Sequence, residues 1–285
     1  MKIAVLSGKG GTGKTLVSVN LAYTLGKANY IDCDVEEPNG FLFFDKDFNN
    51  QVKPEDIITA KIPRVDELKC DGCKKCVDFC KYNALAYTKR LMIFQEVCHS
   101  CGGCMLVCPQ KAIDEIEKEV GKVRYSRFEN VNVFTGMMKI GEASGIPIIK
   151  RLLSLADDKD TIIDCPPGSA CIVMESIQDA DYCVLVAEPT KFGAHNLELV
   201  YKLTKLFDKK VGVVLNKCLE GENPSEDFCI NNNIEIIGRI AFDKELGYLN
   251  SKGIIIAKEA DKYKEVFEDI LEKIRRDIDE TVIGS

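Results

Sequence analysis

The chain has 285 residues, of which 46% are hydrophobic and 29% charged, so it has enough apolar residues for a packed core and is not intrinsically disordered. Its 38 basic and 45 acidic residues give a net charge of −7, which argues against a general nucleic-acid binder or a protein attracted to anionic membranes. No apolar run approaches the roughly 18 residues that a membrane-spanning helix needs.

The chain also contains fourteen cysteines, an unusually high number. Met1 is followed directly by the strand-like run 2–6, without the basic and apolar segments of a signal peptide. We therefore expect a cytoplasmic protein, in which thiols stay reduced and clustered cysteines bind metal more often than they form disulfides.

Strand-like and helix-like patterns alternate along the chain. The run 2–6 predicts a strand, and the apolar spacing over 16–25 predicts a helix that Gly26 closes. A short strand is expected to end near Asp32 and Asp34. Helix-like segments are expected between 120 and 160, and further strands at 161–164, 182–187, 211–215 and 235–238. This alternation predicts a parallel sheet that is covered by helices on both faces.

A glycine-rich loop lies between the first strand and the first helix. Residues 8–15 fit the pattern G-x-x-x-x-G-K-[ST], in which unobstructed backbone N–H groups surround phosphates at a helix N-terminus. Lys14 is expected to reach the β- and γ-phosphates, and Thr15 to place its hydroxyl on magnesium. The predicted nucleotide-binding residues of this loop are Gly8, Gly10, Gly11, Thr12, Gly13, Lys14 and Thr15.

With its additional lysine at position 9, the loop resembles the deviant Walker A loop of the MinD/ParA superfamily, which includes the nitrogenase iron protein and the Mrp-type iron–sulfur carriers. In that family the early lysine reaches the nucleotide of a second subunit. The resemblance therefore implies an ATP-sandwiched homodimer with Lys9 acting in trans. A solvated loop lysine is the alternative.

Further residues occur in the order that this family has them. The resemblance implies that Asp34 orients the attacking water, that Asp32 and Asp164 belong with Thr15 to the magnesium site, and that Asn216 and Lys217 contact the nucleotide. An acid at the end of a strand is otherwise often only a cap or turn residue. We expect hydrolysis of ATP to ADP and phosphate, weak for the chain alone and stimulated by a partner, with the catalytic residues Lys9, Lys14, Asp34 and Asp164.

Eight of the cysteines lie within 70–108, in two runs of C-x₂-C-x₂-C-x₃-C. In bacterial ferredoxins three close cysteines of such a run bind one iron–sulfur cube and the fourth binds the other. Zinc is the alternative, because thiolates also suit it. We predict two 4Fe–4S clusters, the first held by Cys70, Cys73, Cys76 and Cys108, the second by Cys98, Cys101, Cys104 and Cys80.

The cysteine-rich segment interrupts the strand–helix alternation and is interpreted as an insertion. The predicted fold class is α/β, a P-loop NTPase parallel sheet with helices on both faces, interrupted by a small bacterial-ferredoxin-like α+β domain. The predicted parts are 1–60 and 120–285 for the P-loop ATPase domain and 61–119 for the inserted domain with its two clusters.

Cys171 follows Asp164 by seven residues, the offset at which a cluster cysteine follows the switch II aspartate in the nitrogenase iron protein. The hypothesis is that two Cys171 residues, one per subunit, bind a bridging cluster or metal; ordinary burial of a small apolar side chain is the alternative. His99 and His195 are expected not to bind metal.

Residues 264–280 predict an amphipathic helix with four basic and seven acidic residues, the wrong charge for binding anionic lipid. We therefore expect a helix packed on the protein, and no membrane partner.

Over nearly its full length the chain resembles the MinD-superfamily ATPases that contain an inserted ferredoxin domain. The resemblance implies an ATP-hydrolysing homodimer that couples nucleotide state to electron transfer, with ATP or ADP, Mg²⁺ and two 4Fe–4S clusters as cofactors. Two alternatives stay open: an iron–sulfur cluster assembly or carrier ATPase, and a redox-sensing interaction switch. The expected partners are a second copy of the chain and an unidentified redox partner or apo iron–sulfur acceptor protein, without nucleic acid.

Overall fold

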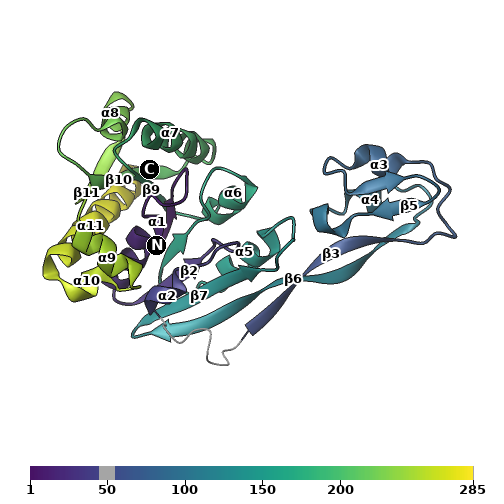
Figure 1. The fold of residues 1–285 in the computed structure, drawn as a ribbon, viewed down its shortest axis with the longest axis horizontal. Helices are drawn as coiled ribbons and strands as arrows, with labels where there is room; N and C mark the ends of the chain where they lie inside the picture. The colour runs from purple at the N-terminus through teal and green to yellow at the C-terminus, as the bar shows by residue number, and fades with distance from the viewer. Residues whose placement is uncertain (45–54, 285) are drawn as a thin grey trace.

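The computed structural model describes residues 1–44 and 55–284, which form a main body and a small lobe joined by two long strands (Figure 1). The body contains a nine-stranded sheet in the order β11-β10-β9-β1-β8-β2-β7-β6-β3. The strands of this sheet are β1 (Lys2–Leu6), β2 (Ala28–Asp32), β3 (Glu55–Val65), β6 (Ile113–Phe128), β7 (Val131–Met138), β8 (Asp160–Asp164), β9 (Tyr182–Ala187), β10 (Lys210–Cys218) and β11 (Glu235–Ala241).

The strands from β11 to β7 run parallel, and β1 lies near their middle between β8 and β9. Parallel strands with both faces covered are apolar along their whole length, and every residue of β9 is buried. The strands predicted at 2–6, 161–164, 182–187, 211–215 and 235–238 are confirmed. So is the α/β fold class, a mostly parallel P-loop NTPase sheet with helices on both faces.

Helices cover both faces of the sheet, and each face has its own apolar core. The predicted helix 16–25 is confirmed as α1, whose bounds are Lys14–Thr24. The helices on its face of the sheet are α1, α2 (Phe41–Phe44), α9 (Lys244–Ser251), α10 (Ile256–Glu259) and α11 (Asp261–Gly284). The helices on the opposite face are α5 (Ile146–Leu153), α6 (Cys171–Ile177), α7 (Lys191–Leu206) and α8 (Pro224–Asn231).

The expectation of helix-like segments between 120 and 160 is wrong for the first part of that range. β6 continues to Phe128, and β7 pairs antiparallel with β6 and parallel with β2. β3 in turn pairs antiparallel with β6, so the sheet has an antiparallel edge in place of the wholly parallel arrangement expected. Fully buried and half-buried residues alternate from Val131 to Thr135, which is the period of a strand and not of a helix.

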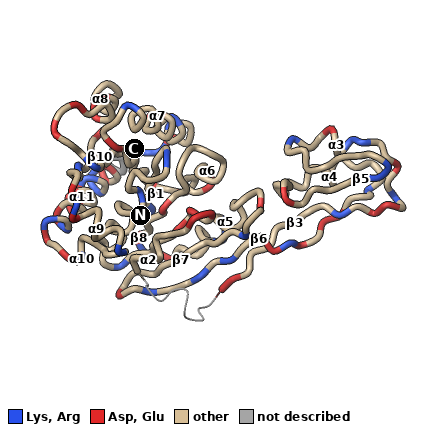
Figure 2. Tube along the Cα trace, viewed as in Figure 1, with Lys and Arg blue, Asp and Glu red and all other residues tan. Residues whose placement is uncertain are grey.

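β3 and β6 extend out of the body and carry the lobe, residues 66–112. Their pairing runs from Glu55 opposite Arg124 to Val65 opposite Ile113. Basic and acidic residues both occur along this pair of strands (Figure 2). The domain boundaries predicted after residues 60 and 119 fall inside the two strands, and the division into domains stays a prediction.

The lobe consists of two halves that repeat one backbone conformation. Counted from the first cysteine of each run, positive φ angles recur at the same positions, 74° at Gly72 and 62° at Lys74 in the first half, 53° at Ser100 and 71° at Gly102 in the second. Left-handed backbone is costly for residues other than glycine, so its recurrence reflects one shared local fold. The elements within the lobe are α3 (Lys75–Phe79), β4 (Leu85–Tyr87), β5 (Leu91–Ile93), the short 3₁₀ helix η1 (Gln95–Val97) and α4 (Gly103–Leu106).

The last helix, α11, packs against the sheet, as expected for residues 264–280. Phe267, Ile270, Leu271 and Ile274 are each at most 4% exposed and belong to the core on that face. Within residues 1–44 and 55–284, no helix combines the length and the apolarity that crossing a bilayer would require.

The packing of α11 leads to a prediction about stability. Phe267→Ala removes a ring that is 1% exposed, and we expect it to lower the free energy of unfolding by about 3–5 kcal/mol. Denaturant unfolding followed by circular dichroism measures this difference. Asp269→Ala, on the exposed side of the same helix, is the control and should stay within about 0.5 kcal/mol of the wild type. Equal stabilities of the two variants would contradict the packing described.

Candidate functional site

The glycine-rich loop leaves β1 and enters α1 at the carboxyl edge of the parallel strands, where ligands bind in folds of this class. Gly13 caps α1 with a φ of 96°, a conformation that favours glycine. A Cβ at this position would also lie 2.1 Å from Nδ2 of Asn216. The hydroxyl of Thr12 is buried and has no hydrogen-bond partner among the described residues, so the loop holds an unpaired polar group as well as its backbone N–H groups.

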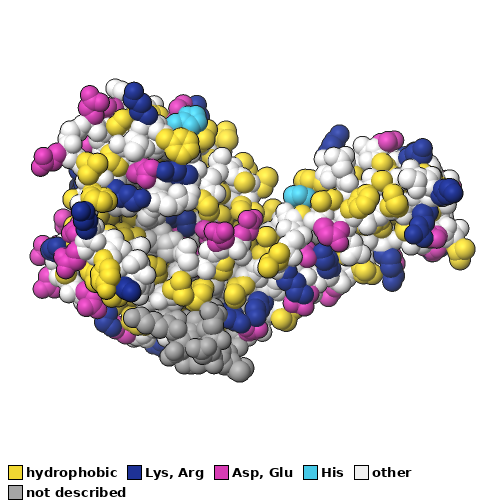
Figure 3. Space-filling view, viewed as in Figure 1, with side chains coloured by type: hydrophobic (Ala, Val, Ile, Leu, Met, Phe, Trp, Pro, Cys, Tyr) yellow, Lys and Arg dark blue, Asp and Glu magenta, His cyan; other side chains and the backbone are white. Residues whose placement is uncertain are grey.

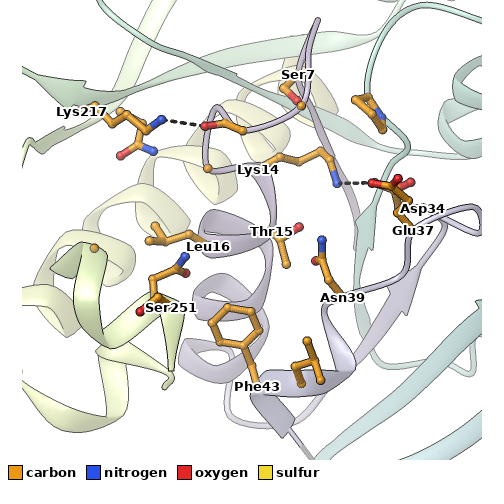
Figure 4. Close-up of a pocket in the computed structure, with 18 of the residues that line it drawn as sticks. Ser7, Lys14, Thr15, Leu16, Asp34, Glu37, Asn39, Phe43, Lys217 and Ser251 are labelled. Carbon is orange, nitrogen blue, oxygen red and sulfur yellow. Dashed lines mark hydrogen bonds and ion pairs between the residues drawn. The ribbon is translucent and has the colours of Figure 1, made fainter. Parts of the chain in front are cut away.

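A cavity of about 690 Å³ opens beside this loop (Figure 4). Lys14, Thr15 and Asp34 lie on one side of it. The opposite walls come from α2, α9 and the end of β11, with Phe43 and Ser251 among them. The volume is within the range of small-molecule sites, about 300–1,000 Å³. The cavity is therefore large enough for a nucleotide whose phosphates lie at the loop.

Lys14 connects the loop to two of the predicted acids. Its Nζ is 2.5 Å from Oδ1 of Asp164 and 3.9 Å from Oδ2 of Asp34. Burial alone would lower the pKa of Lys14, but the neighbouring carboxylates, Asp164 foremost and then Asp34 and Asp32, together outweigh it, and the pKa is raised. The other oxygen of Asp164 accepts a hydrogen bond of 2.7 Å from the hydroxyl of Tyr30. Both carboxylate oxygens of the fully buried Asp164 thus have a donor.

Asp32 and Asp34 follow each other at the end of β2 in different environments. Asp32 is 1% exposed, and burial followed by the neighbouring Asp164 raises its pKa. Its carboxylate accepts hydrogen bonds from the backbone N–H groups of Asp34 and Gly40. Burial also raises the pKa of Asp34, to about 6, with Lys14 opposing the shift. Oxygen donors from Thr15, Asp32 and Asp164 suit Mg²⁺, which prefers hard oxygen ligands.

Asn216 and Lys217, at the end of β10, hold the loop from its other side. Asn216 donates to the carbonyl of Thr12 at 2.7 Å. Lys217 donates to the carbonyl of Gly11, also at 2.7 Å (Figure 4). The structure therefore brings both residues to the phosphate loop. That Asn216 and Lys217 contact the nucleotide stays a prediction.

Lys9 is held within its own chain. Its Nζ donates to Glu188, at the end of β9, and lies 5.2 Å from the ring centroid of Phe192. Nζ of Lys217 lies 3.5 Å from Oε2 of Glu188. Partial burial would raise the pKa of Glu188, but the two lysines outweigh it, and the pKa is lowered. The action of Lys9 in trans stays a prediction.

Two groups of site residues were absent from the sequence predictions. Tyr30 is a fully buried residue of β2 and reads in the sequence as one more residue of an apolar strand. The cavity walls from α2 and α9 include Leu42, Phe43 and Leu246, which carry no motif and reach the site only through the fold. Sequence patterning gave no signal for either group.

The predicted cysteines come together in the lobe as two sets, and each set lines a cavity of its own. Cys98 accepts a hydrogen bond from the N–H of Ser100 and Cys108 from that of Ala112, the kind of bond that stabilises a thiolate. The first cavity is lined by Cys70, Cys73, Cys76 and Cys108. The second cavity is lined by Cys80, Cys98, Cys101 and Cys104.

In the part of the chain that the structure describes, no three Cys, His, Asp or Glu side chains are arranged to hold a single metal ion. Cys171 is exposed at the first turn of α6, and its proposed metal stays a hypothesis.

His99 stacks on Tyr82 with 3.8 Å between ring centroids. Outside the lobe, the buried cysteines are Cys33, Cys165, Cys183 and Cys229, and burial raises the pKa of each of these thiols.

A hollow of about 300 Å³ separates the lobe from the body (Figure 3). On the lobe side it is lined by Cys98, His99 and Ser100, and on the body side by residues 142–144 and the start of α5. The second cysteine set is thus the one nearer to the body, and the first set lies beyond it, where β3 ends at Val65.

The sequence matches the CobQ/CobB/MinD/ParA nucleotide binding domain over residues 3–284. The chain belongs to this family. Its members are P-loop ATPases, in agreement with the position of the glycine-rich loop, Lys14 and Asp164.

Three relatives illustrate the similarity. An uncharacterized protein of Methanocaldococcus jannaschii is 31% identical over 283 residues, 96% of each chain. The septum site-determining protein MinD of Pyrococcus horikoshii, solved with Mg-ADP, is 21% identical, with a TM-score of 0.58 over 96% of this chain and 95% of that one. A segment of 54 residues, 19% of this chain, is 46% identical to part of one subunit of the ion-translocating oxidoreductase complex of Methanosarcina acetivorans, 20% of that protein.

The buried acids lead to a prediction about pH. The pKa of Asp32 is raised in the folded protein, so folding favours the protonated carboxyl. The stabilisation that the protonated carboxyl provides is complete below the unfolded pKa of about 4, and it is lost as the pH rises through the pKa of the folded protein. Asp32→Asn keeps the neutral form at every pH. We compare the free energy of unfolding of this variant with that of the wild type, both without nucleotide. The difference should favour the variant more at pH 8 than at pH 5, by about 1 kcal/mol or more.

Denaturant unfolding at the two pH values measures this gain. Asp179→Asn, at an exposed carboxylate away from the site, is the control and should follow the wild type at both. A gain that is the same at pH 5 and pH 8 would contradict the raised pKa of Asp32.

Proposed function

We propose that the protein is an ATP-hydrolysing homodimer that couples its nucleotide state to electron transfer through two 4Fe–4S clusters in the lobe. The observation that carries this proposal is a path of contacts that leads from the nucleotide cavity, through the segment after β7, to the hollow beside the second cysteine set. Membership of a P-loop ATPase family and the eight paired cysteines support its two parts separately.

The nucleotide part uses residues that already lie around the cavity. Lys14 and the backbone of the loop would hold the phosphates, Thr15 and Asp164 would hold Mg²⁺, and Asp34 would orient the attacking water. The Mg-ADP bound to the structurally similar MinD supports this choice of ligand. In the proposed dimer, Lys9 has to exchange Glu188 for the nucleotide of the partner, so this contact opposes assembly until ATP is present.

The redox part rests on the donor sets of the lobe. Four thiols around each of two cavities, in the crossed pairing of bacterial ferredoxins, suit a 4Fe–4S cluster in each cavity. Such a cluster supplies reversible one-electron transfer when bound. The similarity of a 54-residue segment to part of an oxidoreductase complex adds support for a redox role.

The connection between the two parts starts at Val35, directly after Asp34. The carbonyl of Val35 accepts a hydrogen bond of 2.8 Å from the N–H of Met138, and its side chain packs against Gly136 and Gly145, where a Cβ would lie 2.7 and 2.4 Å from it. A displacement of Val35 would therefore act on both ends of the segment from Met138 to Gly145.

That same segment faces the lobe across the hollow. Residues 142–144 line the hollow opposite Cys98, and Glu142 forms an ion pair of 2.9 Å with Lys118 of β6. We infer that a change at Asp34 on ATP binding or hydrolysis alters the surroundings of the second cysteine set. A nucleotide-dependent change in cluster exposure or in docking of a redox partner follows from this contact path.

The crossed pairing of the cysteines leads to a prediction about iron content. Cys108→Ser should remove the cluster of the first set alone and lower the iron content from about eight to about four atoms per chain. Adding Cys70→Ser should remove no more iron, because both residues belong to one set. Adding Cys98→Ser instead should remove the rest.

Iron and sulfide analysis of anaerobically purified protein measures these values. Cys229→Ser, at a buried cysteine of the body, is the control and should keep full iron content. Loss of all iron in the Cys108/Cys70 pair, or zinc in place of iron in the wild type, would contradict the two-cluster arrangement.

Coupling between nucleotide and clusters leads to a prediction about reduction potential. Exchange of MgADP for a non-hydrolysable MgATP analogue should shift the potential of at least one cluster by about 30 mV or more, which is about 0.7 kcal/mol for a one-electron couple. Redox titration followed by EPR measures the shift. Lys14→Ala should keep both clusters and lose the shift, because its loop no longer holds the phosphates. Potentials that do not respond to nucleotide in the wild type would count against coupling within the chain.

A further inference from the structure

Tyr30 is a buried phenol at the centre of the candidate nucleotide site. It belongs to β2, the strand that lies between β7 and β8 in the sheet, and its side chain is 0% exposed. Its hydroxyl donates to Oδ2 of Asp164 at 2.7 Å, and Asp164 is also 0% exposed. A hydrogen bond to a buried carboxylate is charge-assisted and about twice as strong as one between neutral groups.

This hydrogen bond distinguishes the two oxygens of Asp164. Oδ2 faces Tyr30, and Oδ1 faces Nζ of Lys14 at 2.5 Å. Without a donor the carboxylate could rotate about its Cβ–Cγ bond, whereas the Tyr30 hydroxyl holds Oδ2 against β2 whether or not Lys14 is in place. Oδ1 is therefore the oxygen kept toward the phosphate loop when Lys14 moves to a phosphate.

The same hydroxyl also limits the segment after β2. A Cβ at Gly40 would lie 1.9 Å from the Tyr30 hydroxyl oxygen, so the Gly40 backbone lies directly against it. The N–H of Gly40 donates to Oδ2 of Asp32 at 3.0 Å. Tyr30 thus donates directly to Asp164 and lies against Gly40, the residue whose N–H donates to Asp32.

We propose that Tyr30 is a positioning residue of the metal–nucleotide site, which turns Oδ1 of Asp164 toward the divalent cation. The inference rests on the proposed nucleotide function, because the cation is bound there together with a nucleoside diphosphate or triphosphate. Tyr30 itself touches neither ligand and acts through Asp164. Removal of a hydrogen-bond partner behind a metal ligand typically lowers metal affinity by about 10- to 100-fold.

The test uses Mn²⁺ as the probe, with ADP present and with the full chain carrying its native cysteines. EPR of free Mn²⁺ in a titration gives the dissociation constant without reference to turnover. Tyr30→Phe removes only the hydroxyl and should raise this constant about tenfold or more. The matched control is Tyr182→Phe, which removes another buried hydroxyl, one that donates to Asp277 at 2.8 Å. Tyr182 is the first residue of β9, at the opposite end of the strands from the phosphate loop, so this variant should leave the constant unchanged.

Gly40→Ala provides a second variant should Tyr30→Phe fold poorly. Its methyl group would displace the Tyr30 hydroxyl from Asp164 while keeping the phenol, and it should weaken Mn²⁺ binding in the same direction. Wild-type affinity in either folded variant would overturn the positioning role and leave the proposed function standing. A wild-type protein that binds no Mn²⁺ with ADP would overturn the proposed function, and this inference with it.

Discussion

The buried ion pair between Lys14 and Asp164 is the constraint on which the rest of the site depends. Taking both charges out of water costs several kcal/mol per ion, and the contact offsets this only because each partner has further hydrogen bonds or nearby charges. Tyr30 supplies one such bond to Asp164, and Asp34 lies within 3.9 Å of Lys14. The pair joins the phosphate loop after β1 to the end of the adjacent strand β8. A phosphate that draws Lys14 away leaves Asp164 free for a cation, so anion and cation binding are linked.

The chemistry-bearing residues of this chain could be predicted wherever they are local in sequence. The loop of residues 8–15 carries its function in consecutive backbone groups, and the structure places it between a strand and a helix as expected. The grouping of the cysteines into two sets was also predictable from the repeated spacing of the two runs, and each set lines one cavity of the lobe; that the sets bind clusters stays a prediction. In both cases the prediction comes from spacing within a short stretch of the sequence, which does not depend on how distant segments pair.

What could not be predicted depends on pairing between distant segments. The strand β7 was missed because Val131 to Thr135 has the period of a strand only over a few residues, and its place beside β2 is decided by the sheet. Tyr30 reads as an ordinary residue of a buried strand, and its role appears only when β8 places Asp164 beside it. The walls of the cavity from α2 and α9 likewise come together only in the folded chain.

The way the lobe is attached constrains how nucleotide could influence it. β3 and β6 are paired antiparallel from the body to the lobe, and this connection lies away from the phosphate loop. The segment from Met138 to Gly145 differs, because it packs on Val35 beside the site and lines the hollow beside Cys98. Packed contacts transmit small displacements because the protein interior is nearly incompressible. In the proposed redox protein, the strands therefore hold the clusters in place while the segment after β7 carries the nucleotide state to the nearer one.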